Sequence, residues 1–244
     1  MNENRLSVTN SLIIINVFVF VLGMLVRRPA ILGLPIPGAE TDESFAMVLF
    51  SYSWFTCFME GGLWRLITYQ FVHANVGHIV FNMWALYFFG PAVEHVMGGR
   101  RFLAFYLVCG AAGALCSSLL AGLNLYTSLP DTPAIVAEVN ALAAMVGYEG
   151  IVSPWQMIPL VGASAAVYGV MVATAFMYPH VQISLLFPPI TMKLRTFAIA
   201  VIAIASLIIV FNGNNAGGEA EHLGGISMGA LIMFIWKLRL SARS

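Results

Sequence analysis

The sequence predicts an all-α, polytopic membrane protein in which six transmembrane helices form one bundle. Hydrophobic residues make up 60% of the chain and charged residues only 9%, and the mean hydropathy is +0.88. Soluble domains do not reach these values. A hydrocarbon core of roughly 30 Å requires about 20 helical residues. Six apolar runs approach that length: residues 6–26, 76–97, 102–125, 159–178, 194–211 and 222–238.

No internal repeat, low-complexity tract or change of composition marks a second domain, so we expect one domain over residues 1–244. The first run lacks a Lys-rich start and a small-residue cleavage site, which predicts a retained helix. A formal net charge of zero leaves no basic face for nucleic acid. Cys57, Cys109 and Cys116 form no CxxC pair or ligand cluster, so we expect them to be packing residues.

The basic residues predict that both termini are cytoplasmic. With the N-terminus inside, six spans place eight Arg and Lys residues on the inner side and three outside, which fits the positive-inside rule. The inner group comprises Arg5, Arg100, Arg101, Lys193, Arg195, Lys237, Arg239 and Arg243, and the outer group Arg27, Arg28 and Arg65. The runs that begin near residues 76, 159 and 222 then all enter from the outer face. Their N-terminal ends therefore share one leaflet.

The long first outer segment, residues 27–77, is rich in aromatic residues. This composition favours short interfacial helices in the first outer loop. Apolar residues at helical spacing predict a further piece of this kind over residues 132–146. Two outer segments, residues 124–158 and 212–221, contain no Lys or Arg.

Polar side chains inside a bilayer are costly unless they are paired, so the few within the spans are candidates for function. His78 and Asn82 stand four residues apart and project from one helix face. Ser164 follows Pro159 in the fourth run, which places it roughly 8 Å below the expected helix start. His222 opens the sixth run. These residues belong to the three helices whose N-terminal ends share a leaflet, so we expect them to converge.

The converging residues have the chemistry of a serine hydrolase. A serine hydroxyl becomes an effective nucleophile when a base takes its proton, and neutral imidazole suits that task near pH 7. We expect Ser164 to be the nucleophile and His222 the base. The side chains of His78 and Asn82, with backbone N–H groups around the nucleophile that include that of Ala165, are expected to stabilise the oxyanion.

Small residues allow the fourth and sixth spans to approach closely. The fourth carries Gly162 followed by small residues at helical spacing, and the sixth carries Gly225 and Gly229 in a GxxxG pattern. Such contact would bring the serine and the histidine within hydrogen-bond reach. Glu219 and Glu221 are assigned to the preceding outer loop, so we expect a Ser–His dyad without a third acidic member.

The chain resembles the rhomboid family of intramembrane serine proteases from the first run to the sixth. Several motifs carry this resemblance together. In the first outer loop and the second span, Trp64-Arg65 resembles the family's Trp-Arg, His73 with His78 to Asn82 resembles the His-rich start of the span, and Gly90, Glu94 and Gly98 match a structural GxxxExxxG. In the fourth span, Gly162-Ala-Ser164-Ala resembles the GxSG of the nucleophile, and Tyr168 matches the aromatic residue beside the catalytic histidine. In the sixth span, His222 with Gly225 and Gly229 matches the family signature.

The resemblance implies a rhomboid-like bundle that cleaves transmembrane-anchored proteins near the outer leaflet, with membrane lipid as its other partner and no metal or cofactor. One residue departs from the pattern. Ala165 stands where the family usually has Gly, which adds a methyl group and leaves the backbone N–H in place. We expect Glu94 to be a structural acceptor, His73 to pack a loop, and Arg65 to bond loop carbonyls or lipid phosphate.

Each motif also has a simpler explanation when it is taken alone. A Gly-x-Ser triplet serves helix packing, and a histidine and an asparagine on one face can join helices. Two alternatives to a protease follow. One is an inactive rhomboid relative that binds membrane clients, against which the presence of both Ser164 and His222 argues. The other is a small transporter, against which the clustering of candidates near one face argues.

The cellular location is an expectation drawn from what the sequence lacks. The chain has no transit peptide and no large soluble appendage, which favours a multi-pass protein of the bacterial inner membrane.

Overall fold

The protein is described here by a computed structural model, which covers residues 6–26, 44–127, 132–185, 189–213 and 215–241. Its helices are α1 (Val8–Leu25), α2 (Phe45–Phe50), α3 (Arg65–Thr68), α4 (Val76–Met97), α5 (Gly99–Gly122), α6 (Pro133–Met145), α7 (Ser164–Met177), α8 (Leu194–Val210) and α9 (Ala216–Ser241). Short π and 3-10 turns cover Phe55–Met59, Tyr69–Phe71 and Pro154–Met157. The hairpin of β1 (Gln182–Ser184) and β2 (Thr191–Lys193), which the sequence did not predict, connects α7 to α8.

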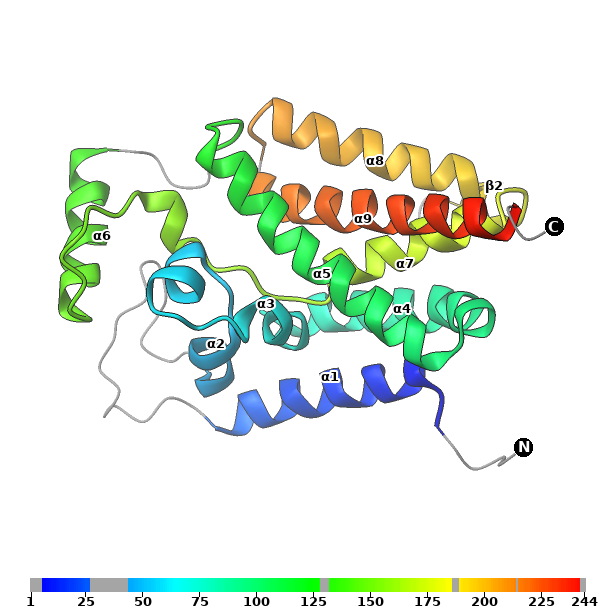
Figure 1. The fold of residues 1–244 in the computed structure, drawn as a ribbon, viewed down its shortest axis with the longest axis horizontal. Coiled ribbons are helices and arrows are strands. Elements are labelled where there is room, and N and C mark those ends of the chain that lie inside the picture. Colours follow the sequence, from blue (N-terminus) through cyan, green and yellow to red (C-terminus); the bar gives the residue numbers. More distant parts are fainter. Residues whose placement is uncertain (1–5, 27–43, 128–131, 186–188, 214, 242–244) are drawn as a thin grey trace.

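Helix α7 is the centre of the bundle. Eleven of its 14 residues are buried, and it packs against α4, α5 and α9. Helix α8 packs mainly on α9, and α1 packs on α4 (Figure 1). The outward faces of α1, α4 and α8 expose large apolar side chains, which suits contact with lipid. The start of α1 and the end of α9 lie at the same end of the bundle (Figure 1).

Glycines bring α7 and α9 into backbone contact. A Cβ atom added at Gly229 would lie 2.8 Å from the carbonyl oxygen of Gly169, and one added at Gly225 would overlap the carbonyl of Ala165. Small residues are enriched where membrane helices approach this closely, because van der Waals packing rather than the hydrophobic effect drives their association.

Glu94 on α4 holds the beginning of α1. Its carboxylate accepts hydrogen bonds from the Val8 N–H at 2.7 Å, the Thr9 N–H at 2.8 Å and the Thr9 hydroxyl at 2.7 Å. These N–H groups lie in the first turn of a helix, where they have no partner within the helix itself. The expectation that Glu94 is a structural acceptor is therefore confirmed.

Three of the described helices, α1, α4 and α5, are long and apolar enough to cross a membrane by length and composition. Helices α7 and α8 are apolar but shorter, with 14 and 17 residues. The helix expected over residues 132–146 is present as α6. Helix α5 begins and ends three residues earlier than the run 102–125. Residues 27–43 of the first outer segment, including Arg27 and Arg28, lie outside the described residues.

Two expected helix starts are wrong. Helix α7 begins at Ser164 and not near Pro159, so Ser164 is its first residue and not one turn below its start. The preceding apolar stretch is not helical, because Leu160 pairs with Tyr52 through backbone hydrogen bonds of 3.0 and 2.6 Å and Gly162 adopts a φ of 118°.

Helix α9 begins at Ala216, six residues before the expected start at His222. Glu219 and Glu221 are consequently helical residues and do not belong to the outer loop, to which the sequence assigned them. Hydropathy missed this first turn and a half because residues 216–221 include two glycines and two glutamates.

Candidate active site

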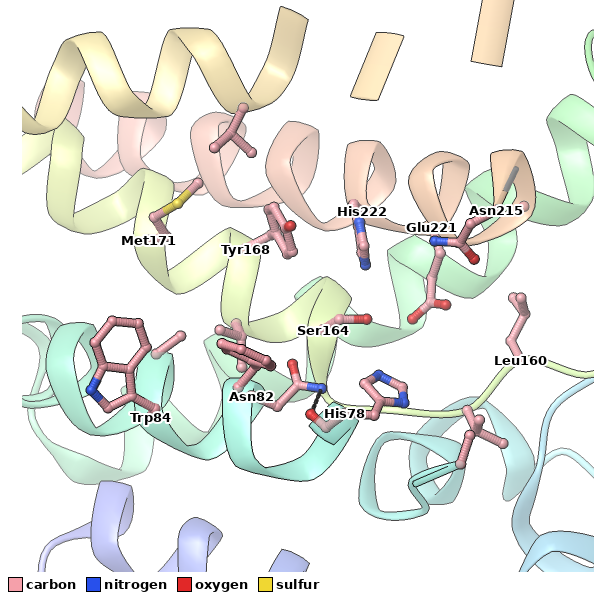
Figure 2. A pocket seen from close by; sticks show the side chains of 18 of the residues that line it. His78, Asn82, Trp84, Leu160, Ser164, Tyr168, Met171, Asn215, Glu221 and His222 are labelled. Carbon is pink, nitrogen blue, oxygen red and sulfur yellow. Dashed lines mark hydrogen bonds between the residues drawn. The ribbon is translucent and has the colours of Figure 1, made fainter. Parts of the chain in front are cut away.

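Ser164 lies on the wall of a large cavity between α4, α7, α8 and the start of α9. The cavity has a volume of about 1230 Å³ and is lined by Ser164, His78, Asn82, Tyr168 and His222 together with apolar residues of α4 and α8. Figure 2 shows these five side chains converging from α4, α7 and α9. As the first residue of α7, Ser164 stands where the positive end of the helix dipole favours negative charge.

His222 is held on two sides. Its ring stacks on that of Tyr168, with centroids 4.2 Å apart and an interplanar angle of 16°. Its Nδ1 lies 3.0 Å from Oε2 of Glu219 on the same helix. The imidazole points from α9 toward Ser164 (Figure 2). Among the described residues no hydrogen bond joins Ser164 to His222, and such catalytic contacts are often long before a substrate binds.

His78 and Asn82 face the cavity from the first two turns of α4, which Asn75 caps by accepting a hydrogen bond from the His78 N–H at 2.9 Å. The side-chain amide of Asn82 donates to the His78 carbonyl at 3.0 Å. An amide has two donor hydrogens, so one stays free for an oxyanion. Gly162 makes room for His78, since a Cβ there would lie 2.6 Å from the imidazole.

The loop before Ser164 is tied to the outer segment. The Gly162 N–H donates to the Tyr69 carbonyl at 3.0 Å, and the Ala163 N–H donates to Nε2 of His73 at 3.4 Å. Burial, reinforced by the nearby His78, lowers the pKa of His73 to about 3. His73 is therefore neutral and can accept this hydrogen bond at physiological pH, which agrees with the expected packing role.

Arg65 is buried. Of its two expected roles, binding to loop carbonyls or to lipid phosphate, the structure shows the first. Its Nη1 donates to the carbonyl of Val48 at 2.9 Å and to that of Ser51 at 2.8 Å. The guanidinium thereby joins α2 and the segment that follows it to α3. Arg65 thereby holds parts of the outer segment together and does not itself line the cavity.

The methyl group of Ala165 is accommodated by a glycine. It points at Gly113 on α5, where an added Cβ would overlap it. The backbone N–H of Ala165, which the sequence offers to the oxyanion, interacts with the carboxylate of Glu221. Glu221 is 2% exposed, its Oε1 has no hydrogen-bond partner among the described residues, and it also interacts with the Tyr69 hydroxyl.

The structure thus brings five of the sequence-predicted side chains, those of Ser164, His78, Asn82, Tyr168 and His222, to one cavity, and their roles stay predictions. Glu219 was missed as a neighbour of the histidine. The spacing of Glu219 and His222 indicates this contact, because residues three apart on a helix are adjacent. The spacing has this meaning only if α9 begins before Glu219.

Comparison with known proteins shows the family of the chain. The Rhomboid domain family matches residues 60–239. The chain is 30% identical to RHOMBOID-like protein 12, mitochondrial, of Arabidopsis thaliana over 213 residues, which cover 84% of the chain and 57% of that protein. It is 25% identical to Rhomboid protease AarA of Providencia stuartii over 239 residues, which cover 96% of the chain and 73% of that protein.

A third relative, Rhomboid protease GluP of Bacillus subtilis, is 33% identical over 109 residues, which cover 45% of the chain and 21% of that protein. The chain spans little more than half of the plant relative and a fifth of this one. The matched region 60–239 contains the outer segment from Glu60 onward, α4 to α8 and nearly all of α9, and hence every residue of the cavity described above. The chain belongs to the rhomboid family of membrane proteins, which includes named proteases.

Proposed function

We propose that the protein is an intramembrane serine endopeptidase that cleaves transmembrane-anchored proteins. The observation that carries this proposal is the convergence, on one cavity within a largely apolar bundle, of a serine at a helix N-terminus, a stacked histidine and two side chains able to bind an oxyanion. These are the parts that acyl transfer requires.

In the proposed reaction Ser164 Oγ attacks the carbonyl carbon of the scissile peptide bond while His222 takes the hydroxyl proton. The oxyanion of the tetrahedral intermediate accepts hydrogen bonds from His78 and Asn82, aided by the N-terminus of α7. His222 then gives the proton to the leaving amine, which leaves an acyl-enzyme on Ser164. Water hydrolyses this ester by the same route, with His222 again acting as base.

The proposed topology has six spans, formed by α1, α4, α5, α7, α8 and α9 in one domain, with both termini cytoplasmic. The start of α1 and the end of α9 lie at one end of the bundle, as an even number of crossings requires (Figure 1). The cavity then faces the outer leaflet. A bacterial inner membrane stays our expectation for its location, although the relatives include proteins named as mitochondrial.

The substrate segment must unwind before it is cut, because a helical peptide bond hides its carbonyl in an intrahelical hydrogen bond. A helix-breaking Gly or Pro near the cleavage position would lower that cost. The proposed chemistry uses side chains of this chain and one water molecule, without a cofactor.

Two other functions are weaker. An inactive family member that binds membrane clients has no need for a histidine held by both stacking and a hydrogen bond. A transporter would need polar groups along a continuous path through the bundle. The polar residues that line this cavity lie near the beginning of α7 and, separately, in β1, and the α4 and α8 walls between them carry apolar residues such as Trp84 and Phe197.

The test uses purified protein in detergent with a tagged transmembrane substrate and a fluorophosphonate probe. We expect Ser164→Ala to lose both cleavage and labelling. Ser206→Ala is the matched control, because that serine lies on α8 and donates only to the Ile202 carbonyl of its own helix at 2.8 Å. Cleavage or labelling that persists in Ser164→Ala at the level of the control would disprove the proposal.

A further inference from the structure

The geometry points to Glu219 as a third member of the catalytic group, a positioning residue that acts through His222. This inference rests on the proposed function and extends it from a Ser–His pair to a Ser–His–Glu arrangement. It depends on an acid three residues before the histidine on a helix that begins at Ala216, and so on this chain's own sequence.

The contact between the two side chains is close and well shielded. Oε2 of Glu219 lies 3.0 Å from Nδ1 of His222, and the side chains are 17% and 12% exposed. Residues at i and i+3 lie on one face of a helix, so the pair is formed within α9 and depends little on the rest of the bundle. Glu219 also sits in the first turn of α9, where the helix dipole favours a carboxylate.

The hydrogen bond determines which ring nitrogen is available for catalysis. An ionised carboxylate can only accept, so Nδ1 of His222 must carry the proton that it donates to Glu219. In the neutral imidazole Nε2 is then the atom with the free lone pair. The ring points toward Ser164 (Figure 2), so the tautomer selected by Glu219 is the one that can remove the serine proton.

Stacking alone does not supply this selection. The Tyr168 ring restricts the imidazole to one plane, at 4.2 Å and 16°, but a ring that flips within that plane would still stack. The hydrogen bond to Glu219 distinguishes the two flipped orientations. Its negative charge also stabilises the imidazolium that forms when the proton leaves Ser164.

The competing explanation is that Glu219 only stabilises the first turn of α9. The two roles differ in what they change. A helix-stabilising carboxylate contributes to the folded state, whereas a positioning carboxylate contributes to the transition state and so changes kcat with little effect on KM.

The experiment compares Glu219→Gln and Glu219→Leu in the full chain with Glu138→Gln, a matched control at an exposed position on α6. Turnover of the tagged transmembrane substrate is measured per folded protein, together with the thermal midpoint. Gln keeps an acceptor oxygen but not the charge, and Leu keeps neither. We expect kcat to fall about tenfold in Gln and about a hundredfold in Leu, with KM and the midpoint close to the control.

Each outcome decides the matter. A kcat within twofold of the control in both variants overturns the inference, as does a fall in kcat that disappears once rates are expressed per folded protein. If Ser164→Ala is inactive while both Glu219 variants are fully active, the protease function stands and a dyad suffices. If Ser164→Ala stays active, the proposed function fails, and the role of Glu219 fails with it.

Discussion

The two sides of α7 differ in how they meet their neighbours. On the side of α5 and α9 glycines allow close contact: Gly225 lies against the Ala165 carbonyl, and Gly113 lies against the Ala165 methyl group. Where α7 faces the space between α4 and α8, the bundle is hollowed into the cavity, and the walls carry bulky apolar residues such as Trp84 and Phe197. Ser164 lies at the boundary between these two sides.

This difference separates two requirements of catalysis. The nucleophile and base must be held within a fraction of an ångström, which the closely packed side provides through contacts that leave no room for adjustment. A transmembrane segment must also reach Ser164, which requires space and apolar surface. We therefore expect substitutions on the packed side to affect the chemical step and substitutions on the cavity side to affect the use of large substrates.

The largest effect is expected at Gly225. In Gly225→Ala the new methyl group would overlap the Ala165 carbonyl, so α9 must move away from α7 and carry His222 with it. We expect cleavage to fall to background and the free energy of unfolding to drop by about 1–3 kcal/mol. Activity assays and thermal unfolding in detergent measure both.

Gly122→Ala is the control for this change. A methyl group there meets the Trp155 ring at 3.4 Å, an ordinary contact, at the last residue of a helix that packs against α9. The pair compares a new methyl group that meets no backbone with one that does. Wild-type activity in Gly225→Ala would show that α7 and α9 are not held as closely as the structure has them.

A smaller effect is expected on the cavity side. Trp84 is 52% exposed and lines the cavity on α4. In Trp84→Ala we expect KM for a transmembrane substrate to rise about three- to tenfold, because lost apolar contact is partly replaced by lipid. The rate of fluorophosphonate labelling should stay within twofold, since the small probe needs only Ser164 and His222.

Phe18→Ala is the control, because Phe18 is a 65% exposed aromatic residue on α1 that does not line the cavity. Equal effects of both substitutions would mean that any lipid-facing aromatic residue matters. A loss of labelling in Trp84→Ala would remove the distinction between the two sides of α7.

The sequence predicted some of these features well for physical reasons. The span 76–97 matches α4 at both ends, because Asn75 is a strong cap, the run between is apolar, and Gly98 with a φ of 78° ends the helix. His78 and Asn82 could therefore be placed on one face from spacing alone. Their approach to Ser164 followed from counting basic residues in the loops.

Other features could not be read from the sequence. The sequence assigns the apolar residues 159–163 to a helix, yet Leu160 pairs with Tyr52 and Gly162 adopts a φ of 118°, so the helix starts only at Ser164. Hydropathy does not distinguish these states. The start of α9 has the opposite property: residues 216–221 are helical but polar and rich in glycine, so hydropathy places them in a loop. Because Glu219 was placed in a loop, its hydrogen bond to His222 was missed.

The smallest effect is expected at Ala165, the residue that departs from the family pattern. Ala165→Gly removes a methyl group that already fits against Gly113, so we expect kcat to change by less than about twofold. A substitution at Gly113 tests the contact between Ala165 and Gly113 more strongly. Gly113→Ala would place two methyl groups in one position, and we expect about a tenfold loss of activity from the resulting displacement of α7.

Combining Gly113→Ala with Ala165→Gly tests whether this contact sets the geometry at Ser164. The second substitution removes the clash between the methyl groups, but the new methyl group would still lie 2.8 Å from the Glu221 carbonyl. We therefore expect partial recovery of activity in the double variant, measured with the same substrate. A double variant as impaired as Gly113→Ala would mean that the Glu221 contact, and not Ala165, limits the approach of α5. Full recovery would mean that the methyl pair alone sets the distance between α5 and α7.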